Sequence, residues 1–346
     1  MSAQAGQLLL YAPNVHTGGG FVLLQAILSS WPKEQPLVAW LDDRARDRLQ
    51  PPLGSRVEWV KASVISRFAA EFSLAKTGLA QDRVLCFHGL PPLLRSKAPI
   101  LVFQQNRIYL GQVSLSDYAR RTRLRLRFEQ GISRLLRHRV ASFWVQTPSM
   151  ARALQSWYGT EAADIHVLPF AAPAEPVTGI EPACWDFVYV ADGEAHKNHR
   201  NLIDAWVLLA RQGLKPTLAL TLSARDYGLK KWVEEQVRTY DLQVTDLGHL
   251  HHSRALKLYR QSRALVFPSK TESFGLPLIE ARNAGLPILA SELDFVRDVC
   301  EPVQSFDPNS PLSIARAVRR FLGQAELPVD PVGAESFLSE VLRDMI

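Results

Sequence analysis

Short apolar runs alternate along the chain with longer stretches in which apolar residues recur every three or four positions. The short runs have the composition of buried strands, and the longer stretches have the spacing of helices that pack through one face. The runs lie at residues 6–15, 36–43, 56–62, 82–93, 99–111, 142–146, 164–170, 186–191, 217–224, 244–250, 263–268 and 286–290. Because strands that alternate with helices form parallel sheets, this pattern predicts an α/β fold. Ligands of such folds bind beyond the carboxyl ends of the strands, so polar residues that follow a run are candidate site residues.

The length of 346 residues favours two domains, since a domain commonly has about 100–200 residues. Residues 171–185 are rich in proline and alanine, a composition that is typical of a linker. We therefore predict a first domain at residues 1–172, a second at residues 173–325 and a final helix within residues 326–346.

The composition narrows the class of protein. Hydrophobic residues make up 47% of the chain, as in a globular protein, and no apolar run approaches the roughly 18–20 residues of a membrane span. The first residues lack the basic segment and the cleavage site of a signal peptide. The three cysteines are widely spaced and indicate neither a disulfide framework nor a zinc motif. Together these features predict a cytoplasmic protein.

Residues 268–291 contain the densest candidate chemistry: the end of a strand, a loop, a short helix and another strand. Ser273, Phe274 and Gly275 come just before the helix. Unpaired backbone N–H groups point outward at a helix start, and the helix dipole there favours an anion. Glycine also lets a ligand approach the backbone closely. The loop is therefore a candidate anion site.

Two glutamates accompany this loop: Glu272 enters it, and Glu280 lies in the first turns of the helix. Ionised carboxylates only accept hydrogen bonds, so a pair beside an anion site suits a ligand that also carries sugar hydroxyls. The alternative is a solvated loop residue and an ordinary charge near a helix start.

Lys197 follows the strand at 186–191 and precedes a helix, where a lysine can hold a diphosphate as a point charge or lie on the surface. Gly19 and Gly20 belong to a glycine cluster between the first strand and its helix. That cluster does not fit the dinucleotide pattern G-x-G-x-x-G, so it is either a tight turn or a point of close ligand approach.

Further polar residues follow strands of the first domain. His88 and Asn106, together with Arg107, lie at such ends, and His88 is either a buried, hydrogen-bonded loop residue or part of a binding site. In the second domain His249, His251 and His252 crowd one turn. No acid or cysteine at ligand spacing accompanies them, so we predict no metal site.

Residues 118–140 form the most basic stretch of the chain. Its apolar residues recur at spacings of three and four, which predicts one helix or two with a weak point at Gly131; they are Leu124, Phe128, Ile132, Leu135 and Leu136. The other faces are crowded with arginines, namely Arg120, Arg121, Arg123, Arg125 and Arg127. A basic amphipathic helix suits an anionic membrane surface, and a solvated helix face is the alternative. Nucleic acid is disfavoured, because no recognised binding motif accompanies the charge.

Residues 271–291 resemble the donor-site signature of retaining glycosyltransferases of the GT-B fold, the large family 4 group. That signature has two glutamates separated by seven residues around a Phe-Gly-Leu-Pro loop, and Ser273 stands where many members have glycine. The resemblance implies two facing Rossmann-like domains with a cleft between them. It also implies that the final helix crosses back onto the first domain.

The resemblance further implies roles for single residues. The diphosphate of the donor would lie against Lys197 and the loop backbone at Phe274, Gly275 and Leu276, with Gly19 and Gly20 nearby. Glu280 would accept from ribose hydroxyls, and Glu272 would contact the donor sugar. Many members carry an arginine in the loop before Lys197; here His196 or Arg200 would compensate. Asn106 lies in a Gln-Asn-Arg segment where a catalytic histidine is expected, so Asn106 and His88 are the catalytic candidates on that side.

The implied activity is transfer of a sugar from a GDP-, UDP- or dTDP-sugar to an acceptor hydroxyl, with retention of configuration. No cofactor or metal is expected, since no Asp-x-Asp occurs. The basic segment at 118–140 favours a lipid-linked acceptor or growing glycan at the inner face of the plasma membrane, as in surface polysaccharide or O-antigen assembly. An epimerase that uses nucleotide-sugars and a non-catalytic binding protein are the alternatives.

Overall fold

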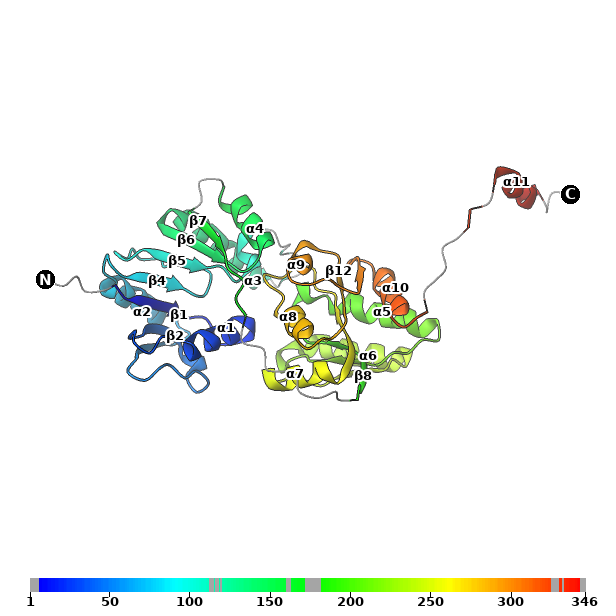
Figure 1. Cartoon of the computed structure of the whole chain (residues 1–346), viewed down its shortest axis with the longest axis horizontal. Coiled ribbons are helices and arrows are strands. Elements are labelled where there is room, and N and C mark those ends of the chain that lie inside the picture. Colours follow the sequence, from blue (N-terminus) through cyan, green and yellow to red (C-terminus); the bar gives the residue numbers. More distant parts are fainter. Residues whose placement is uncertain are drawn as a thin grey trace.

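The computed structural model describes residues 6–111, 115, 118, 120–159, 163–171, 182–324, 330–331 and 333–342. Two parallel sheets, each with helices packed on it, account for most of these residues (Figure 1). The predicted α/β fold with two Rossmann-like domains is therefore confirmed.

The first sheet has the strand order β3-β2-β1-β4-β5-β6-β7. All of its pairings are parallel, as expected for strands that are joined by helices. The strands are β1 (Leu8–Ala12), β2 (Val38–Asp42), β3 (Arg56–Val60), β4 (Arg83–Cys86), β5 (Ile100–Phe103), β6 (Val140–Val145) and β7 (Asp164–Val167). The helices of this domain are α1 (Gly18–Ser29), α2 (Val64–Thr77), α3 (Arg120–Leu136) and α4 (Pro148–Tyr158).

The two faces of the first sheet bury different helices. Leu9 and Leu10 of β1 are adjacent in the chain and point to opposite faces. Leu10 packs in a core with Leu24 of α1, whereas Leu9 packs in a core with Leu74 of α2 and with α4. The connections that contain α2, α3 and α4 all lead towards the β7 edge of the sheet. Because such connections are right-handed, their helices lie on the same face, so α3 shares the face of α2 and α4.

The second sheet has the order β10-β9-β8-β11-β12-β13, again parallel throughout. Its strands are β8 (Trp185–Tyr189), β9 (Leu218–Leu220), β10 (Val244–Asp246), β11 (Ser262–Phe267), β12 (Ile288–Ser291) and β13 (Gln304–Phe306). Its helices are α5 (His199–Arg211), α6 (Tyr227–Tyr240), α7 (His252–Arg260), α8 (Leu276–Asn283), α9 (Asp294–Arg297) and α10 (Pro311–Phe321). Trp206 of α5 is fully buried in the core of this domain.

The two domains touch through loops at the carboxyl ends of their strands. The backbone N–H of Arg107, beyond β5, donates to Ser273 Oγ, beyond β11, at 2.9 Å. At the start of α4 the N–H of Ser149 donates to the Asp298 carboxylate at 2.8 Å. These contacts bring the polar strand ends of both sheets to one region of the molecule.

α2 begins at Val64, because Ser63 caps it by accepting from the N–H of Ser66. One local prediction needs correction. The glycine cluster is not a turn before α1 but its first turn, with Thr17 at the N-cap position. Of the two alternatives for the basic stretch, the structure has one helix. It continues through Gly131, where nothing would obstruct a Cβ and the cost of glycine is about 1 kcal/mol.

The domain boundary expected near residue 172 falls in residues 172–181, which lie outside the described residues. The final helix exists as α11 (Ala334–Leu342). It lies beyond the second domain, at the end opposite to the first domain, and Phe337 is exposed (Figure 1). In this arrangement α11 does not contact the first domain, and the crossing back that the resemblance implies stays a prediction.

Candidate functional site

Lys197 and Glu272 form an ion pair at the carboxyl ends of neighbouring strands. Lys197 ends a short 3-10 turn, Ala195–Lys197, in the loop after β8, and Glu272 follows β11, which pairs with β8. The lysine Nζ lies 2.8 Å from Glu272 Oε1, and both side chains are largely buried. The structure thus joins two of the predicted site residues in a direct, charge-assisted contact.

Several carboxylates surround this lysine. Burial acts against its ammonium charge, but Glu272, Asp192 and Glu194 outweigh that effect and hold the pKa of Lys197 above its ordinary value. Burial, reinforced by the charge of Asp192, raises the pKa of Glu194 to about 7. Lys197 is therefore a permanent cation, and the loop before it contains a carboxyl group that titrates near neutrality.

His196 lies beside Lys197 and links the two domains. Burial and the nearby lysine charge lower the pKa of His196, so its ring is neutral at pH 7. Its Nδ1 lies 3.3 Å from the hydroxyl of Tyr118, which belongs to the first domain. Arg200 instead lies over the Trp232 ring at 4.7 Å. Of the two residues considered as substitutes for the loop arginine, His196 is thus the one in contact with the interdomain region.

Glu280 is not a solvated charge near a helix start. Its Oε2 accepts from the Tyr259 hydroxyl at 3.1 Å, and its Oε1 lies 3.0 Å from His252 Nε2. The carboxylate is therefore fixed in orientation by two groups of α7, and sequence reasoning identified neither. His252 belonged to the histidine cluster that was considered only for a metal. No group of three or more His, Cys, Asp and Glu residues in the described ranges could hold a metal ion.

The loop before α8 has the geometry of an anion site. Gly275 stands at the N-cap position of α8 with φ of 72°, a left-handed conformation that favours glycine. Ser273 accepts from the N–H of Arg107, so the loop is fastened to the first domain. Phe274 is buried in the core and supports the loop by packing. The N–H groups of Gly275 and Leu276 therefore stand at the start of α8, where the dipole favours negative charge.

The glycines of α1 lie against this loop. A Cβ on Gly19 would come within 2.8 Å of Leu276 Cδ1, and a Cβ on Gly20 would come within 3.1 Å of Gln105 Oε1. Both glycines thus permit close approach of α1 to neighbouring elements, which the turn interpretation of the cluster missed.

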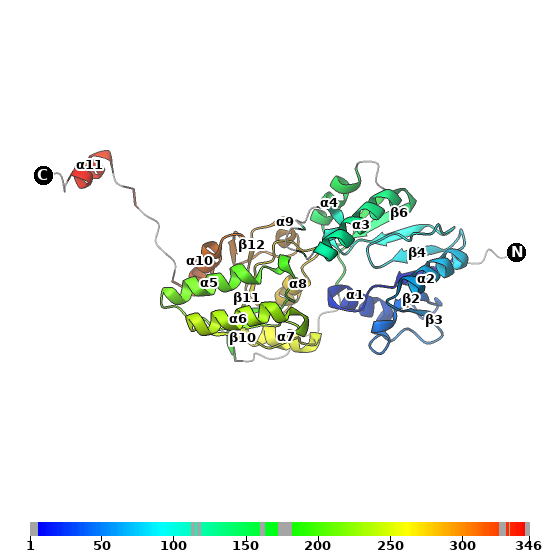
Figure 2. The ribbon, with the colours of Figure 1, turned by 180° about the vertical axis from the view of Figure 1, so that it is seen from behind.

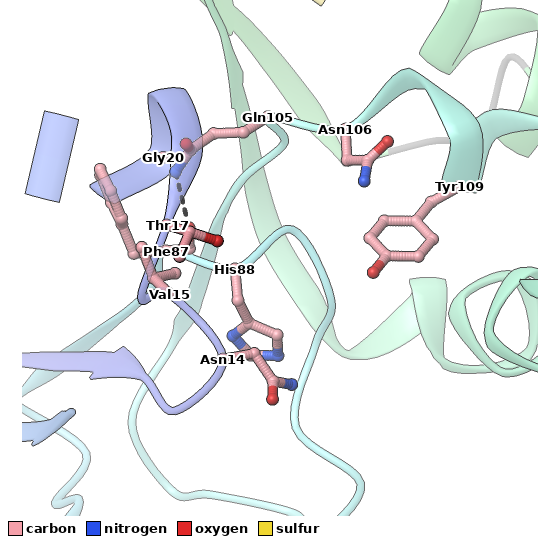
Figure 3. Close-up of a pocket in the computed structure, with 9 residues that line it drawn as sticks. All are labelled: Asn14, Val15, Thr17, Gly20, Phe87, His88, Gln105, Asn106 and Tyr109. Atoms are coloured by element: carbon pink, nitrogen blue, oxygen red, sulfur yellow. Dashed lines mark hydrogen bonds between the residues drawn. The ribbon is translucent and has the colours of Figure 1, made fainter. Parts of the chain in front are cut away.

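A pocket of about 240 Å³ opens in the first domain beside these glycines. It is lined by Asn14, Val15, Thr17, Gly20, Phe87, His88, Gln105, Asn106 and Tyr109. Figure 3 shows His88 and Asn14 on one side of the pocket, with Asn106 and Tyr109 across from them. The pocket therefore brings together both catalytic candidates of the first domain with polar groups that the sequence pattern did not single out.

His88 is a neutral imidazole in this pocket. Burial lowers its pKa to about 4, and its Nδ1 lies 3.5 Å from the Tyr11 carbonyl oxygen. Asn106 uses its side-chain oxygen to accept from the N–H of Ile108 at 2.9 Å, which caps the short 3-10 helix Arg107–Leu110. One end of each candidate is therefore fixed by the protein backbone.

The predicted basic surface lies on α3. Arg120, Arg121, Arg125 and Arg127 are exposed. Arg123 is only partly exposed and donates to the Tyr118 carbonyl oxygen at 3.2 Å, so it braces the segment that contacts His196. No helix in the described ranges is long and apolar enough to cross a membrane.

Comparison with known proteins gives a family match for the second domain: the model of glycosyl transferases group 1 matches residues 175–332. The serotype-specific mannosyltransferase WbdA of Escherichia coli is 38% identical over 166 residues, which cover 46% of this chain and 20% of WbdA. Glycogen synthase of Mycobacterium tuberculosis is 31% identical over 201 residues, which cover 54% of this chain and 45% of the synthase. The chain thus spans between a fifth and a half of the length of these relatives.

Solved structures match along nearly the whole chain. HepE of Anabaena in complex with UDP and glucose has a TM-score of 0.65 at 13% identity, covering 92% of this chain and 90% of HepE. The outer core galactosyltransferase WaaB has a TM-score of 0.59 at 13% identity, covering 98% of this chain and 99% of WaaB. At this identity the similarity shows the fold alone, and it extends over both domains.

Proposed function

We propose that the chain, whose residues 175–332 match the glycosyl transferases group 1 family, is a retaining glycosyltransferase that moves a sugar from a nucleotide diphosphate sugar to an acceptor hydroxyl. The observation that carries the proposal is the Lys197–Glu272 ion pair beside the start of α8. It combines a cation for phosphate, backbone donors for phosphate and an acceptor for sugar hydroxyls within one loop region.

The donor diphosphate would lie between Lys197 Nζ and the backbone N–H groups of Gly275 and Leu276. An ammonium group has three donors, so Lys197 can contact a phosphate oxygen while it keeps its bond to Glu272. Because charge develops on the diphosphate as the glycosidic bond breaks, these fixed donors stabilise the transition state more than the bound donor. Glu272 would then orient the sugar, and Glu280 would accept from the ribose.

The first-domain pocket would receive the reacting end of the acceptor. A neutral His88 can donate or accept a hydrogen bond without repelling a developing positive charge on the sugar. Asn106 and Tyr109 offer further polar groups across the pocket, where an acceptor hydroxyl can be aligned.

Two observations support an acceptor in surface-glycan assembly. WbdA and the O-antigen chain mannosyltransferase B of Escherichia coli are among the relatives, the latter 29% identical over 138 residues, which cover 37% of this chain and 35% of that protein. The exposed arginines of α3 suit the anionic inner leaflet, where a lipid-linked acceptor is held. The donor would be a GDP-, UDP- or dTDP-sugar.

A donor screen followed by turnover tests this proposal. One nucleotide-sugar of the panel should raise the melting temperature, since a ligand that binds only the native state stabilises it. With that donor and a glycan or lipid-linked acceptor, the protein should release free nucleoside diphosphate. The new glycosidic bond should have the same anomeric configuration as the donor, which NMR measures. Glu272→Gln should retain the thermal shift and lose most of the turnover.

Other outcomes identify the alternatives. Conversion of the donor to an isomer without a glycoside product would show an epimerase. Donor binding with no chemistry against any acceptor, identical in parent and Glu272→Gln, would show a binding protein.

A further inference from the structure

The outer face of α2 is apolar. Val64, Ile65, Phe68 and Phe72 are between 57% and 85% exposed, and they recur along one stripe of the helix. The opposite face, with Ala70, Glu71 and Leu74, packs on the sheet. A surface helix normally shows the reverse arrangement, with polar residues outward. Contiguous exposed apolar side chains of this kind mark an interaction site.

The neighbouring helix α3 repeats this arrangement. Leu124, Phe128 and Leu135 are each about 70% exposed. The side that packs on the domain instead contains Leu126, Gln130, Ser133 and Leu136. The apolar spacing that predicts this helix therefore belongs largely to its outward face, between the arginines.

α2 and α3 are adjacent on one face of the first sheet. The crossover argument places both on that face, and Figure 2 shows them on the same side of the sheet. The charge of Arg67 in α2 acts on the Glu129 carboxylate of α3 and on Tyr109 between them. In addition, Arg139, just after α3, donates to the Leu93 carbonyl oxygen at 2.7 Å. Leu93 lies in the loop after β4, the strand that follows α2.

The charges around the two apolar stripes are almost all positive. Arg120, Arg121, Arg125, Arg127, Arg134 and Arg137 are exposed on and just after α3, and Lys76 is exposed on α2. The acids of the two helices are Glu71, which is buried, and Glu129, which lies 3.7 Å from Arg125. Apolar side chains flanked by arginines match a bilayer whose surface is anionic and whose interior is apolar.

We propose that α2 and α3 together form one membrane-insertion surface, in which Phe68, Phe72 and Phe128 enter an anionic leaflet and the arginines bind its headgroups. The inference deepens the proposed function by adding insertion of apolar side chains to the attraction of the α3 arginines. Only the use of this surface, to reach a membrane-held acceptor, rests on the proposed function. It predicts binding with two separable parts, because the Coulombic part weakens as salt shortens the Debye length and the apolar part does not.

Flotation with vesicles of phosphatidylglycerol and phosphatidylcholine tests the two parts separately. Replacing Phe68 and Phe72 with serine should lower the partition coefficient at least about tenfold, and the loss should persist at high salt. Replacing Arg121, Arg125 and Arg127 with glutamine should lower it at low salt by a factor that shrinks as salt rises. Matched controls in the second domain are Tyr227→Ser and a triple glutamine variant of Lys231, Arg238 and Lys257, all exposed. Neither control should change partitioning.

Depth can be measured directly at Phe68. Cys184 is exposed while Cys86 and Cys300 are buried, so Phe68→Cys in a Cys184→Ser background allows one fluorophore to be attached. Its emission should shift to the blue on anionic vesicles, and brominated acyl chains should quench it by half or more.

Three results would overturn the proposal: unquenched fluorescence on bound vesicles, equal partitioning of parent and Phe68/Phe72 variant, or a stable dimer that dissociates when these phenylalanines are replaced. In each variant, an unchanged melting temperature and an unchanged thermal shift with the nucleotide-sugar exclude misfolding. If the parent protein does not bind these vesicles but still binds the donor, this surface is removed and the proposed transferase stays in place.

Discussion

At the scale of single residues, the candidate site depends on which groups hold its charges. Lys197 lies against Glu272, while Glu280 is held by Tyr259 and His252. The two glutamates, which the sequence presents as a symmetric pair around one loop, therefore have different surroundings. We expect them to have different roles, and the effects of their substitution to differ in kind.

Lys197→Ala should weaken binding of the nucleoside diphosphate and leave binding of the nucleoside unchanged. A charge-assisted contact contributes about 1.5–3 kcal/mol, so the dissociation constant should rise between roughly 10-fold and 150-fold. Isothermal titration calorimetry measures both ligands. Arg200→Ala is the matched control, since Arg200 lies over Trp232. Equal diphosphate affinity of the Lys197 variant and the parent would show that the lysine binds no phosphate.

Glu280→Gln should mainly raise the donor KM, and Glu272→Gln should mainly lower kcat. Glutamine keeps one acceptor oxygen but loses the charge that Glu272 supplies beside Lys197. Steady-state kinetics of both variants separate the effects. Parent-like kinetics in both would mean that neither carboxylate contacts the donor.

His199→Phe should flatten the acid side of the stability profile. His199 is buried against Tyr189, neither ring nitrogen has a partner among the described residues, and burial together with the Lys197 charge lowers its pKa to about 3. The unfolded chain therefore binds this proton below about pH 6.5 while the native protein does not. The contribution of His199 to the free energy of unfolding is therefore fully present above that pH. It falls as the pH decreases towards 3, by up to about 1.4 kcal/mol per pH unit.

Urea unfolding between pH 7.5 and pH 4.5 measures this slope. In the His199→Phe variant this slope should be smaller than in the parent by the contribution of about one proton. An unchanged slope in His199→Phe would mean that the buried imidazole becomes charged in the native protein.

At the scale of elements, short helices and loops fix the anion site. The start of α8 is set by a left-handed residue, Gly275, and α1 approaches the same loop through Gly19. Gly275 is needed for its backbone conformation, whereas Gly19 only lies close to the flexible end of Leu276.

Gly275→Ala should lower stability by about 1–2 kcal/mol and weaken diphosphate binding, because the left-handed conformation strains a residue with a Cβ and shifts the loop N–H groups. Gly19→Ala should change the melting temperature little, since only the flexible end of Leu276 must move. Thermal unfolding and diphosphate titration of the two variants give the comparison. Similar melting temperatures for both would contradict the argument from conformation.

At the scale of the whole molecule, contacts between strand-end loops join the domains. Ser273 accepts from the Arg107 N–H, Ser149 donates to Asp298, and Tyr118 lies beside His196. Serine at position 273, where many proteins with the similar signature have glycine, thus has a structural reason. It ties the loop before α8 to the strand-end segment that lines the first-domain pocket.

Ser273→Ala should therefore loosen the contact between the domains without unfolding either of them. Loss of one hydrogen bond of about 1 kcal/mol should speed amide exchange at residues 106–108 several-fold, and α5 should be unaffected. Hydrogen exchange with mass spectrometry reads both segments. Unaltered exchange at 106–108 would show that this bond does not hold the domains together.

The sequence by itself determined the α/β class, nearly all the strands and the loop around Gly275, because these depend on local periodicity and on a contiguous motif. It also made Lys197, Glu272 and Glu280 candidate site residues, since Lys197 and Glu272 follow strands and Glu280 lies in the helix after the loop. Only the tertiary structure decided the partners of these residues. Residues 75 positions apart, such as Lys197 and Glu272, meet only when β8 and β11 pair.

The helix faces were likewise decided by packing. Periodicity shows that α2 and α3 have apolar stripes, but the orientation of a stripe depends on which side chains fit against the sheet. In α3 that side contains Gln130 and Ser133, so Leu124 and Phe128 face outward among the arginines. Charge and spacing along the chain could predict a basic amphipathic helix. The physical reason for its exposed apolar surface lies in contacts that no local pattern encodes.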